Sequence, residues 1–282
     1  MILQPKTWLF VPANQPKLVE NALRTRAEAL ILDLEDSVPD TEKSGARERL
    51  LQIAPALRGR NVWVRVNGHG SSWHADDLLA VRELEEISGF FLPKTENTAD
   101  LPSPETLIRP HAPALKLGLL IESARGVLNL HGLLDARPDI NTVMFGGAQG
   151  ADLMTDLGCG WSIDGPELLH ARQHTLLAIR AAKNVQAVDG VFSTIDDLDG
   201  LGYDTHLSRR LGYRARAVIH PKQIDCVNAV YAPQPEELAW AHRVNETFAE
   251  ALNRGVAAIR VDGKMIDYAM YKLARRILES AT

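Results

Sequence analysis

The sequence is poor in cysteine, with only Cys159 and Cys226 among its 282 residues. These two form neither a CxxC pair nor a multi-cysteine framework, which argues against a small fold held together by several disulfides. We interpret both as reduced thiols, a usage that is typical of a cytoplasmic protein.

The sequence also lacks a stripe of basic residues. Its formal net charge is −5, and its lysines and arginines are scattered singly or in pairs. Nucleic-acid-binding domains usually gather such residues on one face or along one helix. We therefore expect no nucleic-acid partner.

Long apolar runs are missing as well. No run approaches the roughly 20 residues that a transmembrane helix needs, and the N-terminal residues have no apolar stretch followed by a small-residue cleavage site. We expect neither a signal peptide nor a membrane partner. A Gly-rich loop that would cradle phosphates is also missing, so the sequence does not identify residues that contact a nucleotide-containing ligand.

The sequence does contain ample apolar material, 45% of its residues, arranged in short runs that stop abruptly. Eight of these runs are predicted to be β-strands: 8–11, 29–34, 62–66, 89–92, 115–121, 142–145, 187–192 and 215–219. Between most of them, apolar residues recur every three or four positions, which predicts helices at 16–27, 76–86, 124–134 and 166–183. Apolar strands that alternate with helices indicate a parallel sheet covered by helices.

Eight strand–helix units predict a closed α/β (β/α)₈ TIM barrel, with a doubly wound open sheet as the alternative. We expect the barrel to occupy residues 1–255 and residues 256–282 to form a C-terminal arm or lid that carries a helix. Two segments fit the barrel pattern less well. Segment 101–113 is interrupted by four prolines, and the glycines of 194–212 predict only a short helix.

Polar residues follow most of the predicted strands, at the end where a TIM barrel carries its active site. They include Asp33, Glu35, Asp36, Arg65, Asn67, Lys94, Glu122, Asp152 and His220. Most strands therefore deliver a charged or polar side chain to one rim of the predicted barrel.

Glu122 and Asp152 follow the fifth and sixth predicted strands. Carboxylates on adjacent strands can converge on one hard cation, and Mg²⁺ is usually bound by one or two carboxylates, with water and substrate oxygens in the other positions. The structural alternative makes Glu122 a helix-start residue ahead of Ser123 and makes Asp152 an N-cap. The residues alone leave both interpretations open.

Arg65 lies inside an apolar run, where its guanidinium group needs a carboxylate partner or a ligand. An ion pair with Glu35 or Asp36 is the structural alternative, and it is compatible with a role in ligand binding. Glu35 and Asp36 could orient Arg65 or metal-bound water, or could simply belong to an acidic loop. For His220, a structural hydrogen bond is the favoured interpretation.

The ordered strings of the sequence resemble those of one family, the citrate lyase β-subunit-like (CitE-like) group of the HpcH/HpaI aldolase superfamily. The strings begin with LFVPAN at 9–14, ILDLEDSV at 31–38, VRVN at 64–67 and LPK at 92–94. They continue with LIESA at 120–124, DLMTDLG at 152–158, IHPKQI at 219–224 and DGKMID at 262–267. The resemblance covers nearly the whole chain.

The resemblance implies a TIM barrel with a C-terminal arm, Mg²⁺ as cofactor and a homotrimer. By position, Glu122 and Asp152 resemble the metal ligands, and Arg65 resembles the residue that grips the keto-acid part of the substrate. Asp267 resembles an acid or base that the arm brings to a neighbouring subunit. Glu35 and Asp36 resemble acids that line that site.

The implied activity is that of a carbon–carbon lyase, which cleaves a citramalyl-, malyl- or citryl-CoA into acetyl-CoA and an α-keto acid. Alternatives are a condensing enzyme or thioesterase, a partner-dependent β subunit of a citrate lyase complex, and a catalytically silent keto-acid-binding barrel. Two positions depart from the family pattern: Ala151 stands where many relatives have an acid, and Gln15 stands where an arginine is usual. The acyl-CoA and the keto acid therefore stay open.

Overall fold

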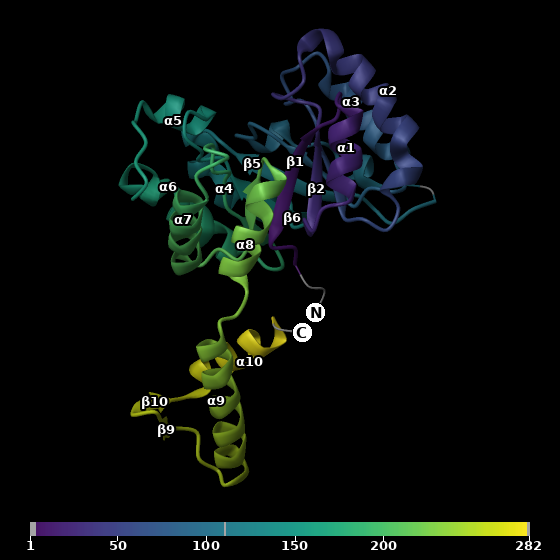
Figure 1. The fold of residues 1–282 in the computed structure, drawn as a ribbon. Coiled ribbons are helices and arrows are strands. Elements are labelled where there is room, and N and C mark those ends of the chain that lie inside the picture. Colours follow the sequence, from purple (N-terminus) through teal and green to yellow (C-terminus); the bar gives the residue numbers. More distant parts are fainter. Residues whose placement is uncertain (1–3, 110, 281–282) are drawn as a thin grey trace. The chain divides into compact units, whose positions relative to one another are not determined.

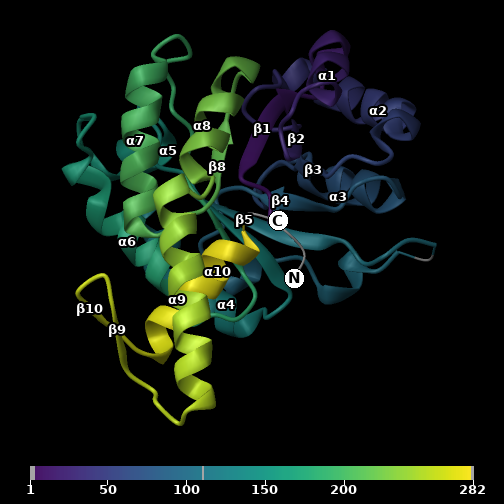
Figure 2. The same cartoon turned by 60° about the horizontal axis from the view of Figure 1, so that its bottom comes forward.

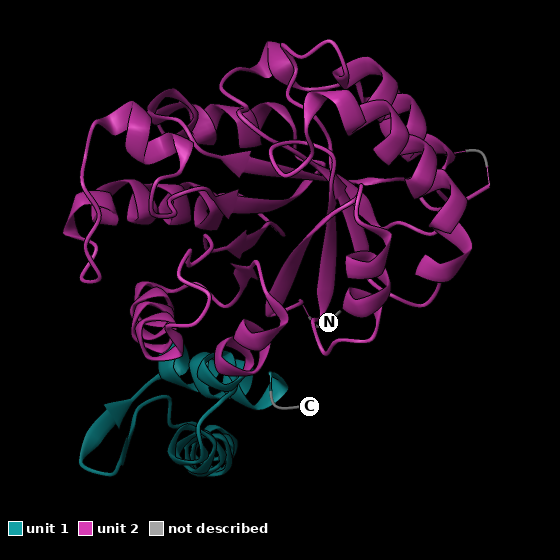
Figure 3. Ribbon diagram, turned by 45° about the horizontal axis from the view of Figure 1, so that its top comes forward, with its two compact units in different colours: residues 1–3, 229–282 teal, residues 4–228 magenta. Residues whose placement is uncertain are grey.

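A computed structural model describes residues 4–109 and 111–280. The chain divides into two compact units, one formed by residues 4–228 and one that begins at Ala229 (Figure 3). The second unit therefore contains a long helix in addition to the residues 256–282 predicted as an arm. A role for residues 256–282 as an arm or lid stays a prediction.

The first unit is built on eight parallel strands, each at a position predicted from the sequence (Figure 1). In chain order they are β1 (Thr7–Pro12), β2 (Ala29–Asp33), β3 (Val62–Arg65), β4 (Gly89–Leu92), β5 (Lys116–Ile121), β6 (Ile140–Phe145), β7 (Gln186–Val188) and β8 (Arg216–Val218). Hydrogen bonding joins them in the order β7-β6-β5-β4-β3-β2-β1-β8. The predicted TIM-barrel fold is confirmed, because sequential strands pair in parallel around a nearly closed barrel.

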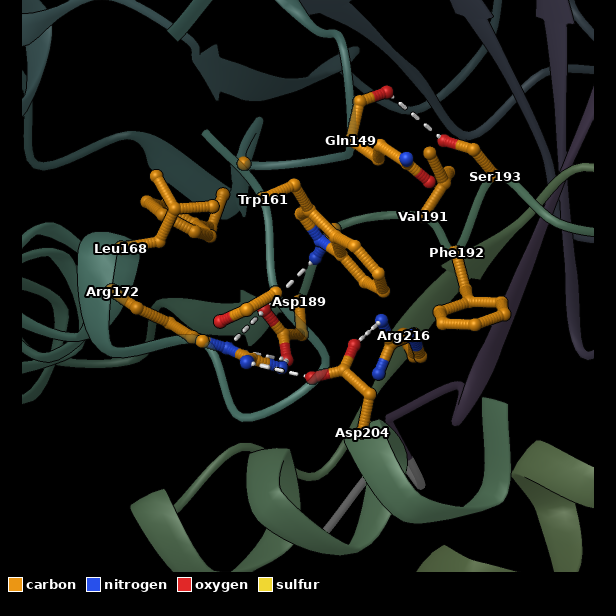
Figure 4. Close-up of a pocket in the computed structure, with 15 residues that line it drawn as sticks. Gln149, Trp161, Leu168, Arg172, Asp189, Val191, Phe192, Ser193, Asp204 and Arg216 are labelled. Atoms are coloured by element: carbon orange, nitrogen blue, oxygen red, sulfur yellow. Dashed lines mark hydrogen bonds and ion pairs between the residues drawn. The ribbon is translucent and has the colours of Figure 1, made fainter. Parts of the chain in front are cut away.

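The barrel closes between β7 and β8 through a single residue, Asp189. Its backbone N–H donates to the carbonyl of Ala215 at 2.8 Å, and its own carbonyl accepts the N–H of Ala217 at 2.9 Å. Its carboxylate accepts from Arg172 (Nε–Oδ1 3.0 Å), and Asp204 bridges Arg172 and Arg216 (Figure 4).

These four charges, three of them buried, compensate one another around a space of only about 20 Å³, roughly enough for one water molecule. We interpret the cluster as the structural closure of the barrel.

The barrel interior is filled by side chains from all eight strands. Trp8 packs edge-on against Trp63 (ring centroids 5.3 Å apart) and Phe91 (5.6 Å). In register with Trp8, the neighbouring strands carry Ala29 and Ala217. This alternation of large and small residues lets the indole ring lie inside the barrel without overpacking.

Substitution of alanine for Gly118 in β5 is expected to destabilise the fold. The added Cβ would lie 2.6 Å from two ring carbons of Phe91, a fully buried residue in the same aromatic cluster. Overpacking of this kind costs about 1–3 kcal/mol in free energy of unfolding. Urea denaturation checks the effect, with Gly132→Ala as the control. Gly132 is an exposed helical glycine with nothing within 4 Å of the added Cβ, so this variant should be slightly more stable than the parent.

Helices surround the strands of this unit (Figure 2). They are α1 (Pro16–Leu23), α2 (Lys43–Ile53), α3 (His74–Glu83), α4 (Ala124–Ala136), α5 (Asp152–Leu157), α6 (Pro166–Ala181) and α7 (Leu198–Leu211). A further helix, α8 (Ile224–Tyr231), begins in this unit and ends in the second. Short 3₁₀ turns occur at η1 (Asp40–Glu42), η2 (Ala54–Leu57), η3 (Thr98–Asp100), η4 (Pro104–Leu107) and η5 (Pro221–Gln223).

Two helical segments test the weaker predictions. After β4, the described part of the proline-rich stretch contains one short 3₁₀ turn, η4, and no α-helix, as the prolines indicated. The prediction of only a short helix in 194–212 was wrong, because α7 has 14 residues. Asp197 caps its start by accepting the N–H of Gly200, and Gly212 ends it with a positive φ. Gly200 therefore lies in the first turn of the helix, and Gly212 is its C-terminal cap.

The second unit contains α9 (Pro235–Asn253), a hairpin of β9 (Ile259–Val261) and β10 (Lys264–Ile266), and α10 (Tyr268–Glu279). Its own small core includes Val244, Phe248, Ile266 and Ala274. Phe248 stacks on the ring of Tyr271 with centroids 4.9 Å apart. In the part of the chain described by the structure, no helix combines the length and the apolar character needed to span a bilayer.

Candidate active site

The site residues predicted in the barrel lie at one end of it, where the strands finish. Asp36 follows β2, Arg65 ends β3, Glu122 follows β5 and Asp152 begins α5. All four border one cavity of about 510 Å³. Apolar side chains, among them Phe10, Leu120 and Met144, line the remainder. The cavity has the position that active sites take in TIM barrels.

Arg65 is held in place by carboxylates. Its Nε and Nη2 donate to the two oxygens of Asp33, each at 2.7 Å, and its Nη1 lies 2.9 Å from Glu35 and 3.5 Å from Asp36. The predicted ion pair therefore exists, but its main partner is Asp33, which the sequence analysis had left without a role. The guanidinium group also lies over the ring of Phe10.

Asp33 organises the loop that carries the two acids. Burial alone would raise its pKa, but Arg65, Ser37 and the N–H of Glu35 hold it below the ordinary value. The same carboxylate accepts hydrogen bonds from Ser37 and from the backbone of Glu35. Lys43 holds the loop from the other side, because its ammonium group donates to the carbonyls of Leu34 and Glu35.

The sequence placed Lys94 on this rim but indicated no role for it. Its Nζ lies 2.9 Å from Glu35, 3.3 Å from Asp36 and 3.2 Å from Asp152, and its backbone N–H donates to Glu122 at 3.0 Å. Its φ of +52° is unusual for a residue other than glycine. The signal available in the sequence was a lysine directly after a proline at a strand end, but its partners come from three other segments, at residues 35–36, 122 and 152.

Glu122 is a buried carboxylate. Burial, together with the negative charge of Glu35, raises its pKa to about 8 despite Arg65 and Lys94. Gly146, at the end of β6, makes room for it, because a Cβ there would lie 2.5 Å from the Cβ of Glu122. Ser123 provides the N-cap of α4, so the glutamate has no capping role in that helix.

Asp152 differs from Glu122 in exposure. Its side chain is 55% exposed, and it is the first residue of α5, after the N-cap position occupied by Ala151. The expected alternative as an N-cap is therefore wrong, although an acid in the first turn is favourable for a helix. Lys94 contacts both acids, Asp152 through its ammonium group and Glu122 through its backbone N–H, and both acids line the same cavity.

The donor set fits a hard cation that keeps part of its hydration shell. Among residues 4–109 and 111–280, no group of three or more His, Cys, Asp or Glu side chains forms a ready metal cage. Two carboxylates beside an open cavity leave room for water and substrate oxygens, the usual arrangement for Mg²⁺. The raised pKa of Glu122 also indicates a buried acid whose ionised form lacks full compensation.

Asp267 and His220 both serve as N-caps in the structure. Asp267 belongs to the second unit and caps α10, where its Oδ1 accepts the N–H groups of Ala269 (2.9 Å) and Met270 (3.2 Å). His220 caps η5 by accepting the N–H of Lys222 on Nδ1, so its structural interpretation is confirmed.

Comparisons with known proteins agree with this architecture. Residues 6–221 match the family model described as HpcH/HpaI aldolase/citrate lyase. The citrate lyase subunit beta of Leuconostoc mesenteroides subsp. cremoris is 33% identical over 287 residues, which cover 98% of this chain and 93% of that protein. The (3S)-malyl-CoA thioesterase of Cereibacter sphaeroides is also 33% identical, over 97% of this chain and 93% of that enzyme.

Among solved structures, the protein CitE of Mycobacterium tuberculosis in complex with magnesium, acetoacetate and coenzyme A has a TM-score of 0.79 and 30% identity to this chain. That match covers 98% of this chain and 97% of the CitE chain. The similarity therefore includes both units of the chain, and it rests on sequence as well as fold.

Proposed function

Since the chain belongs to the HpcH/HpaI aldolase/citrate lyase family, we propose that it is a Mg²⁺-dependent carbon–carbon lyase. Its proposed substrate is a β-hydroxyacyl-CoA of the citramalyl-, malyl- or citryl-CoA type, cleaved to acetyl-CoA and an α-keto acid. The observation that carries the proposal is the cavity on which Glu122, Asp152 and Arg65 converge.

Glu122 and Asp152 are the proposed metal ligands. Their oxygen donors suit Mg²⁺, and the similar CitE protein was crystallised with magnesium. When bound, Mg²⁺ would supply a Lewis acid for the oxygen atoms of the keto acid. The protein's part is to hold two carboxylates at the cavity wall and to leave the remaining positions open.

Arg65 is the proposed anchor for the substrate carboxylate. Its hydrogen bonds to Asp33 and Asp36 engage three of its five N–H groups. Nη1 also lies 2.9 Å from Glu35, so within the described residues one N–H of Nη2 is left for a ligand in the cavity that Arg65 borders. Because the guanidinium group is already fixed by Asp33, little conformational entropy would be lost on binding.

Cleavage requires a proton acceptor and a proton donor. The substrate hydroxyl gives up its proton, the Cα–Cβ bond breaks, and the electron pair of that bond moves into the thioester enolate as the keto acid forms. We propose that Asp36, whose side chain is 54% exposed and lines the cavity, accepts the hydroxyl proton, with Glu35 beside it. Asp267 of a neighbouring subunit, in a homotrimer, is the proposed donor that protonates the enolate carbon.

A thioesterase is the second candidate, because the similar enzyme of Cereibacter sphaeroides bears that name. The same cavity would then position water against the thioester carbonyl. A partner-dependent subunit is a third candidate, because the Leuconostoc relative is a subunit of citrate lyase. The three differ in their products and in their need for another protein.

Product analysis separates these candidates. The purified chain with Mg²⁺ is incubated with malyl-, citramalyl- and citryl-CoA, and thioesters and acids are quantified by mass spectrometry. We expect acetyl-CoA and an α-keto acid in equal amounts from at least one substrate, without any other protein. Free CoA with an intact hydroxy acid would identify a thioesterase instead. Metal binding without turnover of any free thioester would contradict a stand-alone lyase.

A further inference from the structure

The rim of the cavity holds more negative than positive charge. Asp36, Glu122 and Asp152 line it and Glu35 lies next to them without lining this cavity, while Arg65 makes its closest contacts with a fifth acid, Asp33. Lys94 contacts all four of the other acids, through its ammonium group with Glu35, Asp36 and Asp152 and through its backbone N–H with Glu122. Arg65 shares only Glu35 and Asp36 with it. Its positive charge therefore compensates the carboxylates among which a divalent ion would bind.

The contacts of Lys94 differ in strength. Glu35 is 5% exposed, so its ion pair with Lys94 is shielded from water. Asp152 and Lys94 are both about half exposed, at 55% and 45% of their side chains, and pairs of that kind contribute little and exchange easily. The contacts with Asp152 and with the similarly exposed Asp36 (54%) are thus the ones that a stronger cation would replace first, and Asp152 is the one of these two acids that we propose binds the metal.

A second cavity offers the ammonium group of Lys94 other acidic neighbours. Lys94 borders a separate cavity of about 530 Å³, whose walls include Glu35, Asp36, Glu96 and Asp100. A lysine that leaves Asp152 therefore keeps its contact with Glu35 and stays surrounded by acids. The backbone N–H of Lys94 holds Glu122 in either case, because that bond does not depend on the side chain.

We propose that Lys94 is a built-in counter-cation, which pairs with Asp152 in the metal-free protein and releases this carboxylate to the divalent cation. This inference rests on the proposed metal site at Glu122 and Asp152. Lys94 stabilises the metal-free rim and, in exchange, lowers the affinity of the site for the metal. A lysine that merely supported the local structure would have the opposite effect, because its loss would weaken metal binding.

The test measures Mg²⁺ affinity by isothermal titration calorimetry on the metal-free full chain. Lys94→Met is expected to bind Mg²⁺ about tenfold more tightly than wild type, the order of change for removing one partly screened positive charge beside a divalent ion. Its melting temperature without metal should be lower than that of wild type, and the increase on adding Mg²⁺ should be larger. Lys94→Arg, which keeps the charge, should restore wild-type affinity.

Two further variants make the result specific. Lys116→Met removes the same charge from an exposed residue at the start of β5, at the opposite end of the barrel, and should leave Mg²⁺ affinity unchanged. Lys94→Gln, measured in parallel, is uncharged but polar and should also bind Mg²⁺ more tightly. If both uncharged variants at position 94 bind Mg²⁺ with unchanged or lower affinity, the proposed role of Lys94 is wrong, but the proposed metal site is not affected. Failure of wild type to bind Mg²⁺ would overturn the metal site as well.

Discussion

Glu122→Gln is expected to lower turnover of the acyl-CoA substrate by roughly a thousandfold, the size of loss that follows removal of one strong electrostatic contact to the transition state. Glutamine keeps the volume of the side chain, and its carbonyl oxygen can still accept the N–H of Lys94. What it removes is the negative charge that we propose binds Mg²⁺. Calorimetric titration should therefore show much weaker Mg²⁺ binding.

The stability of this variant gives a second, independent expectation. Burial and the charge of Glu35 oppose ionisation of Glu122, so a neutral amide at this position should not destabilise the metal-free protein and should raise its melting temperature slightly. Glu20→Gln, at an exposed position on α1, is the control and should change neither property. Wild-type Mg²⁺ affinity together with wild-type turnover in Glu122→Gln would contradict the metal assignment.

Arg65→Met is expected to abolish activity and also to lower the free energy of unfolding by about 3–5 kcal/mol, the usual result of removing one partner from a buried ion pair. Asp33 and Glu35 are 1% and 5% exposed. Asp33 would lose its closest cation, and Glu35 would keep only Lys94. Urea denaturation measures the loss. Arg26→Met, which breaks an exposed ion pair with Asp225, is the control and should change stability little.

The stability loss in Arg65→Met should depend on pH. In wild type the pKa of Asp33 lies below its ordinary value of 3.8, so its contribution is present above that pH and is lost as the pH falls through the lowered pKa. Without Arg65, burial would raise this pKa, and the penalty would disappear as the acid becomes protonated. The difference between the two proteins should therefore be largest near neutral pH and should shrink toward pH 3.8.

A double variant separates folding from substrate binding. Arg65→Met combined with Asp33→Asn removes the buried charge that Arg65 compensates, so part of the lost stability should return. Activity should remain absent, because no guanidinium group would be left to bind the substrate carboxylate. Recovery of activity in the double variant would show that Arg65 acts only through the folding of its neighbours.

Much of the barrel could be predicted from the sequence because its strands are short, buried on both faces and nearly continuously apolar. The polar residues that end them stand out for the same reason, and this made Arg65 and Glu122 visible. The prediction for 194–212 failed because glycine was taken as a helix breaker. In the structure Gly200 donates its N–H to the cap residue Asp197, and Gly212 ends the helix.

The sequence by itself therefore determined the order of strands, the rim that carries the acids and, through the family strings, the candidate metal ligands. Tertiary structure decided which charges meet. It joined Arg65 to Asp33 rather than chiefly to Glu35 or Asp36, and it placed Lys94 among the acids. Local patterns determine where a strand ends, but contacts across the rim depend on side-chain directions and loop conformations, including the positive φ of Lys94, that no short stretch of sequence specifies.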